Sequence, residues 1–315
     1  MDYSGKTILV VGAGRSGTAS ARFLLARGAR VILTDKKNVD TLGPMITPLC
    51  DLAASHGELV LELGGHREHT FRSCDLVVVS PGVPLALPLF DISRRAGIPV
   101  IAEVELAFRH LKGRIIGITG SNGKTTTTVL VTELLKGAGL SAFSAGNIGT
   151  PLISLAANSC PDDIYVVELS SFQLEGIDRF RPFIASILNL TPDHLDRYAD
   201  FDDYIKAKRR IFANQTFTDY AVLNADDPRT SALAAEVTSQ PVLFSRLQEV
   251  AAGTFVRGDK VYYRSESGEK ELFATNTVSL KGSHNLENVL AACSMALLTG
   301  ASPDTFAETI RSFPG

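Results

Sequence analysis

The segment with the clearest chemical signature spans Gly117–Thr126 and reads Gly-Ile-Thr-Gly-Ser-Asn-Gly-Lys-Thr-Thr. The apolar run before it, 114–119, predicts a strand, and the stretch after it, 127–136, predicts a helix. Gly120 and Gly123 allow successive backbone N–H groups to face one anion, and the helix N-terminus favours negative charge there. The segment therefore predicts a phosphate-binding loop, and ATP is the first ligand to consider.

The Gly-Lys-Thr triplet in this loop supplies the groups that phosphate binding requires. Lys124 can reach the β and γ phosphates, and Thr125 can bind Mg²⁺ through its hydroxyl. The strict form of the motif has glycine at position 118, where this chain has Ile118. A turn that only joins strand to helix is the alternative interpretation, but it gives the triplet no role.

Composition narrows the class of protein. The chain has 315 residues, 45% of them hydrophobic, which favours two domains of ordinary size. Its net charge of -3 provides no basic field for a polyanion, so nucleic acid is not expected as a partner. The four cysteines occur singly, and no apolar run approaches the length of a membrane span. We expect a cytoplasmic monomer that binds small molecules and no membrane.

The N-terminal third has the form of a dinucleotide-binding fingerprint. A predicted strand, 6–11, leads into Gly12-Ala-Gly-Arg-Ser-Gly17, then a helix to Leu25 and a second strand that ends at Asp35. Taken alone, this pattern predicts NAD, with Asp35 on a ribose hydroxyl. The same geometry serves any nucleotide diphosphate, so the ligand stays open.

Another predicted strand, 75–79, ends in the tight turn Ser80-Pro-Gly-Val83. Carboxyl ends of strands in open α/β sheets are where ligands bind, but the turn could also be purely structural. A short strand at 99–102 and a helix from Glu103 then lead toward the phosphate-binding loop. We place a domain boundary between residues 110 and 111.

Polar residues follow two further predicted strands in the middle of the chain. The strand 164–168 ends in Glu168, and the strand 184–190 is followed by His194. Because parallel strands share one carboxyl edge, we expect both side chains to lie beside the loop that carries Lys124. A carboxylate and a neutral imidazole are suitable ligands for divalent cations. A structural role for His194 is the alternative.

The predicted helix 201–212 places a lysine on its apolar face. Lys208 shares that face with Tyr204 and Ile211, whereas Lys206 points elsewhere. Such a lysine is paired, extends its amine to water, or loses its proton. A neutral amine can react with CO₂ to give a carbamate, which is an anionic metal ligand.

The remainder of the chain completes an α/β fold. A strand at 220–224 and alternating segments near 254–263 and 271–278 predict a small antiparallel edge on a mostly parallel sheet. Gly282 opens an apolar helix to Leu298 whose first turn has polar side chains that either cap the helix or contact a base, namely His284, Asn285 and Asn288. The fold class is therefore a Rossmann-like domain, 1–110, followed by a P-loop ATPase-type domain, 111–315.

These motifs together resemble the Mur ligases of peptidoglycan synthesis, in order and over the whole chain. The segments that carry the resemblance are Thr119–Thr126, Gly146-Asn-Ile-Gly149, Glu168-Leu-Ser-Ser-Phe-Gln173, Asp193-His-Leu-Asp-Arg-Tyr198, Tyr204 with Lys208, and His284-Asn285. The N-terminal fingerprint and Ser80–Val83 favour members that join D-glutamate to UDP-N-acetylmuramoyl-L-alanine. The folate polyglutamate synthases share the central pattern but not that N-terminal region.

The resemblance implies ATP-dependent amide-bond formation through an acyl phosphate, in the service of cell-wall biogenesis, cell shape and cell division. It implies two Mg²⁺ sites, one held by Thr125 and Glu168, the other by His194 and a CO₂-derived carbamate on Lys208. Lys124, His194 and Lys208 are the implied catalytic residues. The implied ATP-binding residues are Gly120, Ser121, Asn122, Gly123, Lys124, Thr125, Thr126, Asn285 and Asn288. The implied substrate-binding residues are Arg15, Ser16, Asp35, Lys36, Gly82, Asn147 and Ser170.

One departure from the family pattern concerns the end of the chain. Members of this kind continue past the position of Gly315 into a third domain that binds the incoming amino acid. We therefore expect a truncated chain that is inactive, or nearly so, by itself. Addition of a different amino acid, such as alanine or diaminopimelate, stays open. The alternatives from other classes are an NAD-dependent dehydrogenase and a non-catalytic nucleotide-binding module.

Overall fold

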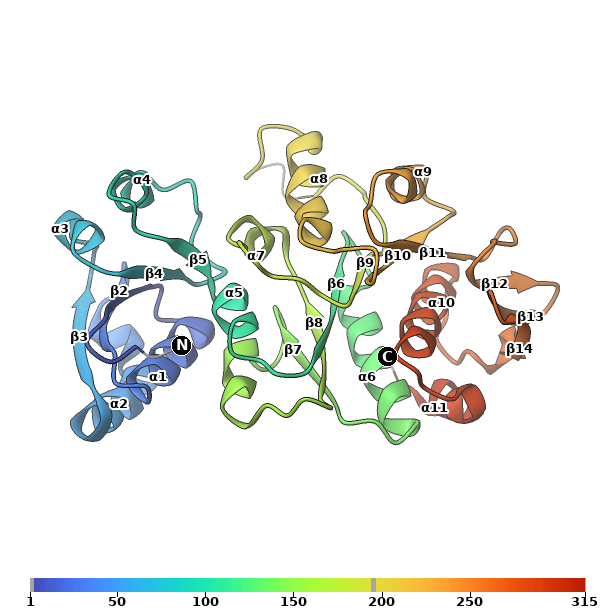
Figure 1. Cartoon of the computed structure of the whole chain (residues 1–315), viewed down its shortest axis with the longest axis horizontal. Coiled ribbons are helices and arrows are strands. Elements are labelled where there is room, and N and C mark those ends of the chain that lie inside the picture. Colours follow the sequence, from blue (N-terminus) through green and yellow to red (C-terminus); the bar gives the residue numbers. More distant parts are fainter. Residues whose placement is uncertain (1–2, 194–196, 315) are drawn as a thin grey trace. The chain divides into compact units, whose positions relative to one another are not determined.

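The computed structural model describes residues 3–193 and 197–314. Its contacts divide the chain into two compact units (Figure 1). The first unit comprises the residues up to Leu111 together with two later segments, Thr150–Ser159 and Phe172–Phe180, and the second unit comprises the rest. We predicted two consecutive domains, 1–110 and 111–315. The two units differ from that division, because the two later segments of the first unit fall within 111–315. The functions assigned to the two domains stay predictions.

The first unit is built on a parallel sheet in the order β3-β2-β1-β4-β5. Its strands are β1 Thr7–Val11, β2 Arg30–Asp35, β3 Glu58–Leu63, β4 Leu76–Val79 and β5 Val100–Ala102. Continuous apolar sequences form its centre, because helices cover both faces of a parallel sheet. The order reverses at β1, so the glycine-rich loop after β1 lies at a switch point, where open α/β sheets bind ligands.

Helices on both faces complete this unit, with α1 and α2 on one face and α3 and α4 on the other (Figure 1). They are α1 Arg15–Leu25, α2 Val39–His56, α3 Glu68–Arg72 and α4 Pro88–Arg95, joined by α5 Glu103–Phe108 and the 3₁₀ helix η1 Leu152–Asn158. The helix α7, Ser171–Glu175, begins in the second unit and continues into the first.

The second unit contains a sheet of nine strands in the order β14-β13-β12-β11-β10-β9-β6-β8-β7. The parallel strands are β6 Arg114–Thr119, β7 Ala142–Gly146, β8 Ile164–Glu168, β9 Ile184–Ile187, β10 Tyr220–Asn224, β11 Gln240–Ser245 and β12 Gly253–Arg257. Two antiparallel strands, β13 Lys260–Ser265 and β14 Gly268–Ala274, form one edge. The predicted α/β class with a small antiparallel edge is confirmed.

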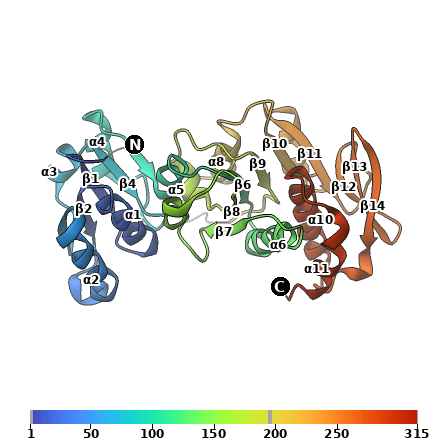
Figure 2. The ribbon, with the colours of Figure 1, turned by 60° about the horizontal axis from the view of Figure 1, so that its bottom comes forward.

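Helices cover both faces of this sheet. α6 Lys124–Gly137 and α10 Ser283–Leu298 lie side by side on one face (Figures 1 and 2), and α8 Phe201–Arg209 and α9 Pro228–Ala232 lie on the other. The remaining elements are α11 Phe306–Ser312 and the 3₁₀ helices η2 Arg210–Phe212, η3 Leu233–Ala235, η4 Thr275–Thr277 and η5 Pro303–Thr305. Residues of α6 and α10 are buried together with the strands, so this contact forms the main core of the unit.

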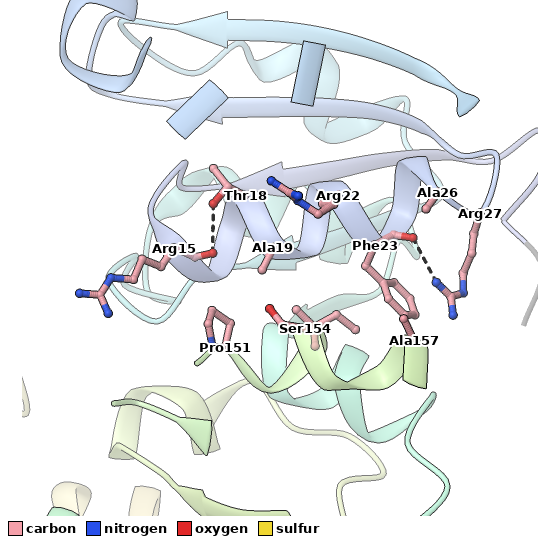
Figure 3. A pocket seen from close by; sticks show the side chains of 11 residues that line it. Arg15, Thr18, Ala19, Arg22, Phe23, Ala26, Arg27, Pro151, Ser154 and Ala157 are labelled. Atoms are coloured by element: carbon pink, nitrogen blue, oxygen red, sulfur yellow. Dashed lines mark hydrogen bonds between the residues drawn. The ribbon is translucent and has the colours of Figure 1, made fainter. Parts of the chain in front are cut away.

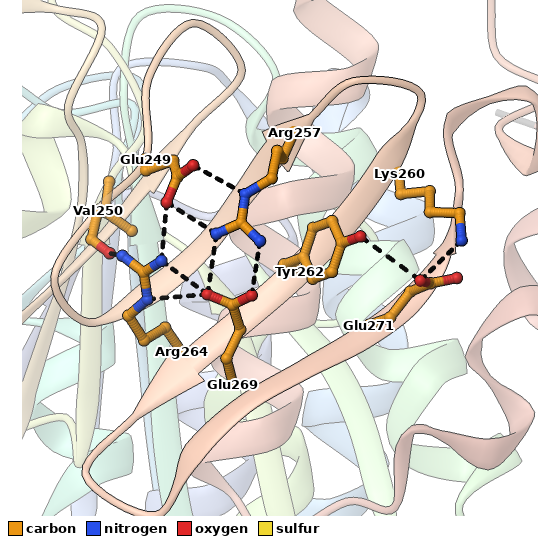
Figure 4. Close-up of polar contacts among 8 residues, drawn as sticks. All are labelled: Glu249, Val250, Arg257, Lys260, Tyr262, Arg264, Glu269 and Glu271. Atoms are coloured by element: carbon orange, nitrogen blue, oxygen red, sulfur yellow. Dashed lines mark hydrogen bonds and ion pairs between the residues drawn. The ribbon is translucent and has the colours of Figure 1, made fainter.

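Exposed ion pairs cross the antiparallel edge (Figure 4). Arg257 makes paired contacts of 2.7–3.0 Å with the carboxylates of Glu249 and Glu269, and Arg264 contacts both carboxylates as well. These hydrogen bonds lower the pKa of Glu249 to about 2. Because exposed ion pairs add little stability, their main effect is to fix which residues face each other across the hairpins.

Within the described residues, no helix is both long and apolar enough to cross a membrane. The cysteines in this part of the chain are all free thiols; Cys50 and Cys160 are exposed, whereas Cys74 and Cys293 are buried. Burial raises the pKa of the Cys74 thiol to about 11, so this side chain is a protonated core residue.

Glu103, the first residue of α5, is a fully buried carboxyl group. Its Oε1 accepts a hydrogen bond of 2.8 Å from the Ile153 amide, and within the described structure its Oε2 has no partner. Burial raises its pKa from 4.5 to about 7, although backbone hydrogen bonds from Ile153 and Leu152 act against that rise. The folded state therefore binds this proton more tightly than the unfolded state, and stability falls as the pH rises from 4.5 to 7.

Glu103→Gln is expected to stabilise the first unit above pH 7. The amide keeps the acceptor for Ile153 and removes a titration that costs roughly 3 kcal/mol, while its unpaired NH₂ costs about 1 kcal/mol. We expect a net gain of roughly 2 kcal/mol at pH 8, and a loss of up to about 1 kcal/mol at pH 4.5, in urea unfolding followed by circular dichroism. Parallel stability curves for the two proteins from pH 4.5 to 8 would contradict this assignment.

Candidate active site

The phosphate-binding loop connects β6 to α6 in the second unit. Gly120 has φ of 150° and Gly123, the N-cap residue of α6, has φ of 80°, and both values favour glycine. A Cβ atom on Gly123 would also lie 2.2 Å from Oδ1 of Asn288 in α10. The conformation of the loop and its close contact with α10 therefore explain the two glycines.

Lys124 is the first residue of α6, and its side chain turns back over the loop. Its Nζ donates hydrogen bonds to the carbonyl oxygens of Gly120 at 2.9 Å and Ser121 at 2.8 Å. Burial lowers its pKa, whereas the charges of Glu168 and Asp193 raise it. The amine is thus held by two carbonyl oxygens, a contact that phosphate oxygens can replace.

Glu168 ends β8 and is 2% exposed. Its Oε2 accepts a hydrogen bond of 2.8 Å from the Thr125 hydroxyl, and its Oε1 accepts one of 3.0 Å from the Asn147 side-chain amide. A hydroxyl and a carboxylate are oxygen ligands of the kind that Mg²⁺ prefers, so this donor set fits the ion. Asn147 orients the carboxylate and so determines where its second oxygen points.

Lys208 points inward from α8, as its place on the apolar helical face predicted, and it is 2% exposed. Its Nζ donates to the carbonyl of Gly120 at 2.9 Å and lies 3.3 Å from the hydroxyl of Thr119. The same atom lies 4.6 Å from the centre of the Tyr204 ring. Burial, and next the charge of Lys124, lower its pKa to about 7, although Asp193 and Glu168 act in the opposite direction.

Lys124 and Lys208 therefore share one acceptor, the carbonyl oxygen of Gly120. The strand order explains this proximity, because β6 lies between β8 and β9, and their three carboxyl ends meet at one edge. His194 lies outside the described residues. Within the described residues, no three His, Cys, Asp or Glu side chains are grouped so that they could bind a metal.

The first turn of α10 does not use its asparagines as caps. Its N-cap residue, Gly282, makes no side-chain capping bond. Asn285 donates its side-chain amide to the carbonyl of Lys281 at 2.8 Å and accepts from the amide of Asn288 at 3.2 Å. The capping interpretation was therefore wrong for these two residues, and Asn288 instead contacts the phosphate-binding loop at Gly123.

Sequence reasoning missed the segment Asn189–Thr191, which follows β9 and which we call the strap. Its Asn189 pairs with both backbone groups of Asn122, accepting from N at 2.8 Å and donating to O at 3.1 Å. Its Thr191 exchanges hydrogen bonds of 3.0 and 2.8 Å with the Ser121 hydroxyl. The available signal was the pair of polar residues Asn189 and Thr191, which follow a buried strand at the edge that binds ligands.

In the first unit, the glycine-rich loop follows β1, and Asp35 ends β2. The Asp35 carboxylate accepts hydrogen bonds from the backbone amides of Ala13 at 2.7 Å and Lys37 at 2.8 Å. Ser80, at the end of β4, donates its hydroxyl to the carbonyl of Gly12 at 2.9 Å. These contacts fix the loop between the ends of three neighbouring strands.

The other predicted substrate residues lie around this loop or at the corresponding edge of the second unit. Arg15 is exposed and Ser16 half-buried at the start of α1, whereas Lys36 and Gly82 are exposed after β2 and β4. Ser170 is half-buried after β8. All of them thus follow the carboxyl ends of strands.

Gly17→Ala is expected to destabilise the first unit by at least about 3 kcal/mol. A Cβ atom at this position would lie 1.7 Å from the carbonyl oxygen of Gly12, which is backbone and cannot rotate away. Gly14→Ala is the matched control, since its Cβ would have no neighbour within 4 Å, and it should change stability by less than about 1 kcal/mol. Equal effects of the two variants in urea unfolding would refute this close approach.

A groove of about 580 Å³ lies between α1 and η1 in the first unit (Figure 3). It is lined by Arg15, Arg22 and Arg27 and by apolar residues that include Phe23 and Ile153. The Arg27 guanidinium lies 3.6 Å from the centre of the Phe23 ring and donates to the Phe23 carbonyl. In Figure 3 the guanidinium groups of Arg15 and Arg27 point in different directions, so they do not converge on one anion.

Comparison with known families gives two matches. Residues 118–296 match the Mur ligase middle domain, and residues 6–102 match the MurD-like N-terminal domain of Mur ligases. The chain is 49% identical over 313 residues to a UDP-N-acetylmuramoylalanine--D-glutamate ligase of Koribacter versatilis, covering 99% of this chain and 68% of that protein. A protein of the same name from Geotalea uraniireducens is 48% identical over 315 residues, with coverage of 100% and 68%.

Solved structures share the fold at lower sequence identity. The UDP-N-acetylmuramate:L-alanyl-gamma-D-glutamyl-meso-diaminopimelate ligase of Neisseria meningitides is 19% identical, with a TM-score of 0.64 and 98% of each chain covered. The UDP-N-acetylmuramate-alanine ligase of Thermotoga maritima is 20% identical, with a TM-score of 0.56, covering 98% of this chain and 69% of that one. At these identities the likeness concerns the fold.

Proposed function

Because this chain belongs to the Mur ligase family, we propose that it contributes to the ATP-dependent joining of D-glutamate to UDP-N-acetylmuramoyl-L-alanine in peptidoglycan synthesis. The names of its relatives at 48–49% identity support this substrate pair. The observation that carries the proposal is the convergence of Lys124, the Thr125–Glu168 pair and Lys208 at one sheet edge. The curated relatives are about half as long again as this chain, so we propose the complete reaction for a protein of their length.

The proposed reaction has two steps. The substrate carboxylate attacks the γ-phosphorus of ATP, which forms an acyl phosphate and releases ADP. The amine of D-glutamate then attacks the acyl carbon, which forms the amide and releases phosphate. Each step requires a nucleotide held in line with the attacking group, and positioning supplies most of the catalysis in phosphoryl transfer.

Lys124 and the first turn of α6 are the proposed phosphate site. A helix leaves its first backbone N–H groups without partners inside the helix, and these favour an anion at its N-terminus. Gly120, Ser121, Asn122 and Gly123 shape the loop, and Thr126 adds an amide of the first turn. We propose that Lys124 exchanges its two carbonyl partners for phosphate oxygens when ATP binds.

Mg²⁺ is the proposed metal cofactor. Thr125 and Glu168 would hold one ion, and a bound ion supplies charge neutralisation on the phosphates. Lys208 in its present form donates hydrogen bonds, so it can hold a second ion only after chemical modification. Its pKa of about 7 leaves a large neutral fraction near pH 7. The neutral amine attacks CO₂ and loses a proton, which gives an anionic carbamate; His194 is the proposed fellow ligand.

The first unit is the proposed site for uridine diphosphate. Arg15 and Ser16 begin α1, whose N-terminus favours a pyrophosphate, and Asp35, Lys36 and Gly82 follow neighbouring strands. Asn147 and Ser170 are the proposed contacts of the muramoyl-alanine portion, and Asn285 and Asn288 those of the nucleotide. We therefore propose uridine diphosphate as the ligand of this unit, where the fingerprint alone predicted NAD. The alternative of an NAD-dependent dehydrogenase then has no support. We further propose that the protein is a monomer and that it is cytoplasmic; the free thiols support the location.

A thermal-shift comparison tests the identity of the substrate. UDP-N-acetylmuramoyl-L-alanine at about 100 times its dissociation constant should stabilise the folded chain by roughly 2.7 kcal/mol. UDP-N-acetylmuramic acid and the L-alanyl-D-glutamate form should stabilise it less at the same concentration. A preference for either of these would assign the protein to a different step of amino-acid addition.

A further inference from the structure

The tip of the phosphate-binding loop is held by the backbone and the side chain of Asn189, a residue outside the loop. The Ser121 amide donates to the carbonyl of Asn189 at 3.1 Å, and the Asn122 amide donates to Oδ1 of Asn189 at 2.8 Å. Two of the loop's backbone donors are therefore already occupied. A phosphate must use the donors that follow, which are those of Gly123 and the first turn of α6.

The Asn189 side chain pairs with the backbone of Asn122 as a neighbouring strand would, through one accepted and one donated hydrogen bond. Its side-chain amide also donates to the carbonyl of Asn122 at 3.1 Å, so one residue satisfies both backbone groups of Asn122. An amide side chain can do this because it presents one donor and one acceptor side by side. An apolar side chain at position 189 would pair with neither backbone group, and a carboxylate could not donate to the carbonyl of Asn122.

The strap also makes hydrogen bonds to residues outside the phosphate-binding loop. Asp227, the N-cap residue of α9, accepts a hydrogen bond of 2.8 Å from the Leu190 amide. The Ser121 hydroxyl, which pairs with Thr191, lies 3.2 Å from the hydroxyl of the buried Tyr204 in α8. The loop tip is thus connected to the ends of β9 and β10 and to α8, so its conformation is fixed before any ligand arrives.

We infer that Asn189 is a positioning residue, which holds the phosphate-binding loop open for the nucleotide and leaves the first turn of α6 as the phosphate contact. The inference rests on the proposed binding of ATP to this loop. A loop that is already ordered does not lose conformational entropy when the ligand binds, so the affinity is higher than for a mobile loop.

Asn189→Ala is expected to weaken binding of ATP with Mg²⁺ to this chain about ten-fold in calorimetry, since two hydrogen bonds to the loop are lost. Asn189→Gln retains both groups at a half-buried position and should recover part of the affinity. Ser186→Ala is the control, because it removes a buried hydrogen bond of the preceding strand β9, from its hydroxyl to the Val222 carbonyl, in which no residue of the loop takes part. It should leave the ATP affinity unchanged.

Hydrogen exchange of the backbone amides provides a readout that does not depend on ATP. The Ser121 and Asn122 amides should exchange faster in Asn189→Ala than in the wild type or in Ser186→Ala. Failure of the wild type to bind ATP would refute the proposed function, while the exchange rates would still decide the role of Asn189. Unchanged exchange at both amides, or an unchanged ATP affinity in Asn189→Ala beside a wild type that binds, would overturn the inference.

Discussion

Glu168→Gln is expected to reduce amide-bond formation by on the order of 10²–10³-fold in a protein of the relatives' length. The substitution keeps the size of the side chain but removes the charge that faces Thr125 at 2.8 Å. The amide oxygen that remains is neutral, so it binds Mg²⁺ more weakly than the carboxylate and does not offset the charge of the ion. The measurement is release of phosphate and of the amide product at saturating substrates over a range of Mg²⁺ concentrations.

Glu133→Gln is the matched control for this variant. Glu133 is half-buried in the second half of α6 and pairs with Lys136 at 3.0 Å; its place along the helix keeps its charge away from the loop. Its turnover should equal that of the wild type at every Mg²⁺ concentration. The account would be contradicted by a Glu168→Gln protein that keeps both the wild-type rate and the wild-type dependence on Mg²⁺.

The second large effect is expected at Lys208. Arginine at this position keeps a positive charge but cannot form a carbamate, because its guanidinium stays protonated. Methionine has a similar length and removes the charge. We expect both variants to lose turnover on the order of 10²-fold or more, since both remove the proposed anionic ligand. Turnover of the wild type should also fall when CO₂ and bicarbonate are depleted.

Comparing the two substitutions separates the possible roles of this buried lysine. If Lys208 acts as a cation beside the phosphates, Lys208→Arg retains activity and Lys208→Met does not. If it acts as a carbamate, both variants are inactive, and intact-protein mass measurement with bicarbonate detects added CO₂ on the wild type alone. A fully protonated, unmodified Lys208 in active, Mg²⁺-loaded enzyme would rule out the carbamate.

The parts of the fold that follow local patterns could be predicted from the sequence. The glycine-rich loops lie after β1 and β6, where strand, turn and helix are adjacent in sequence. Lys208 was predicted to point inward from the spacing of its apolar neighbours, and it is buried. These features depend on residues within one or two helical turns, so a periodic pattern is sufficient to find them.

Features that depend on distant contacts or on unfavourable local sequence were not predicted. The helix α2 contains Pro44 and Pro48, which argue against a helix interior, and it begins at the Asn38 cap. The segments Thr150–Ser159 and Phe172–Phe180 belong to the first unit because they contact residues that are distant from them in sequence. The strap depends on a side chain, Asn189, that pairs with backbone far away in sequence. No local pattern encodes such pairings.

The most direct test of the central claim is a crystal structure of this chain with Mg²⁺ and a non-hydrolysable ATP analogue. We predict a γ-phosphate in contact with Lys124 Nζ and the backbone amides at the start of α6, and a metal ion in contact with the Thr125 hydroxyl and the Glu168 carboxylate. The nucleotide bound instead at the loop after β1, with Lys124 still hydrogen-bonded to the carbonyls of Gly120 and Ser121, would contradict the account.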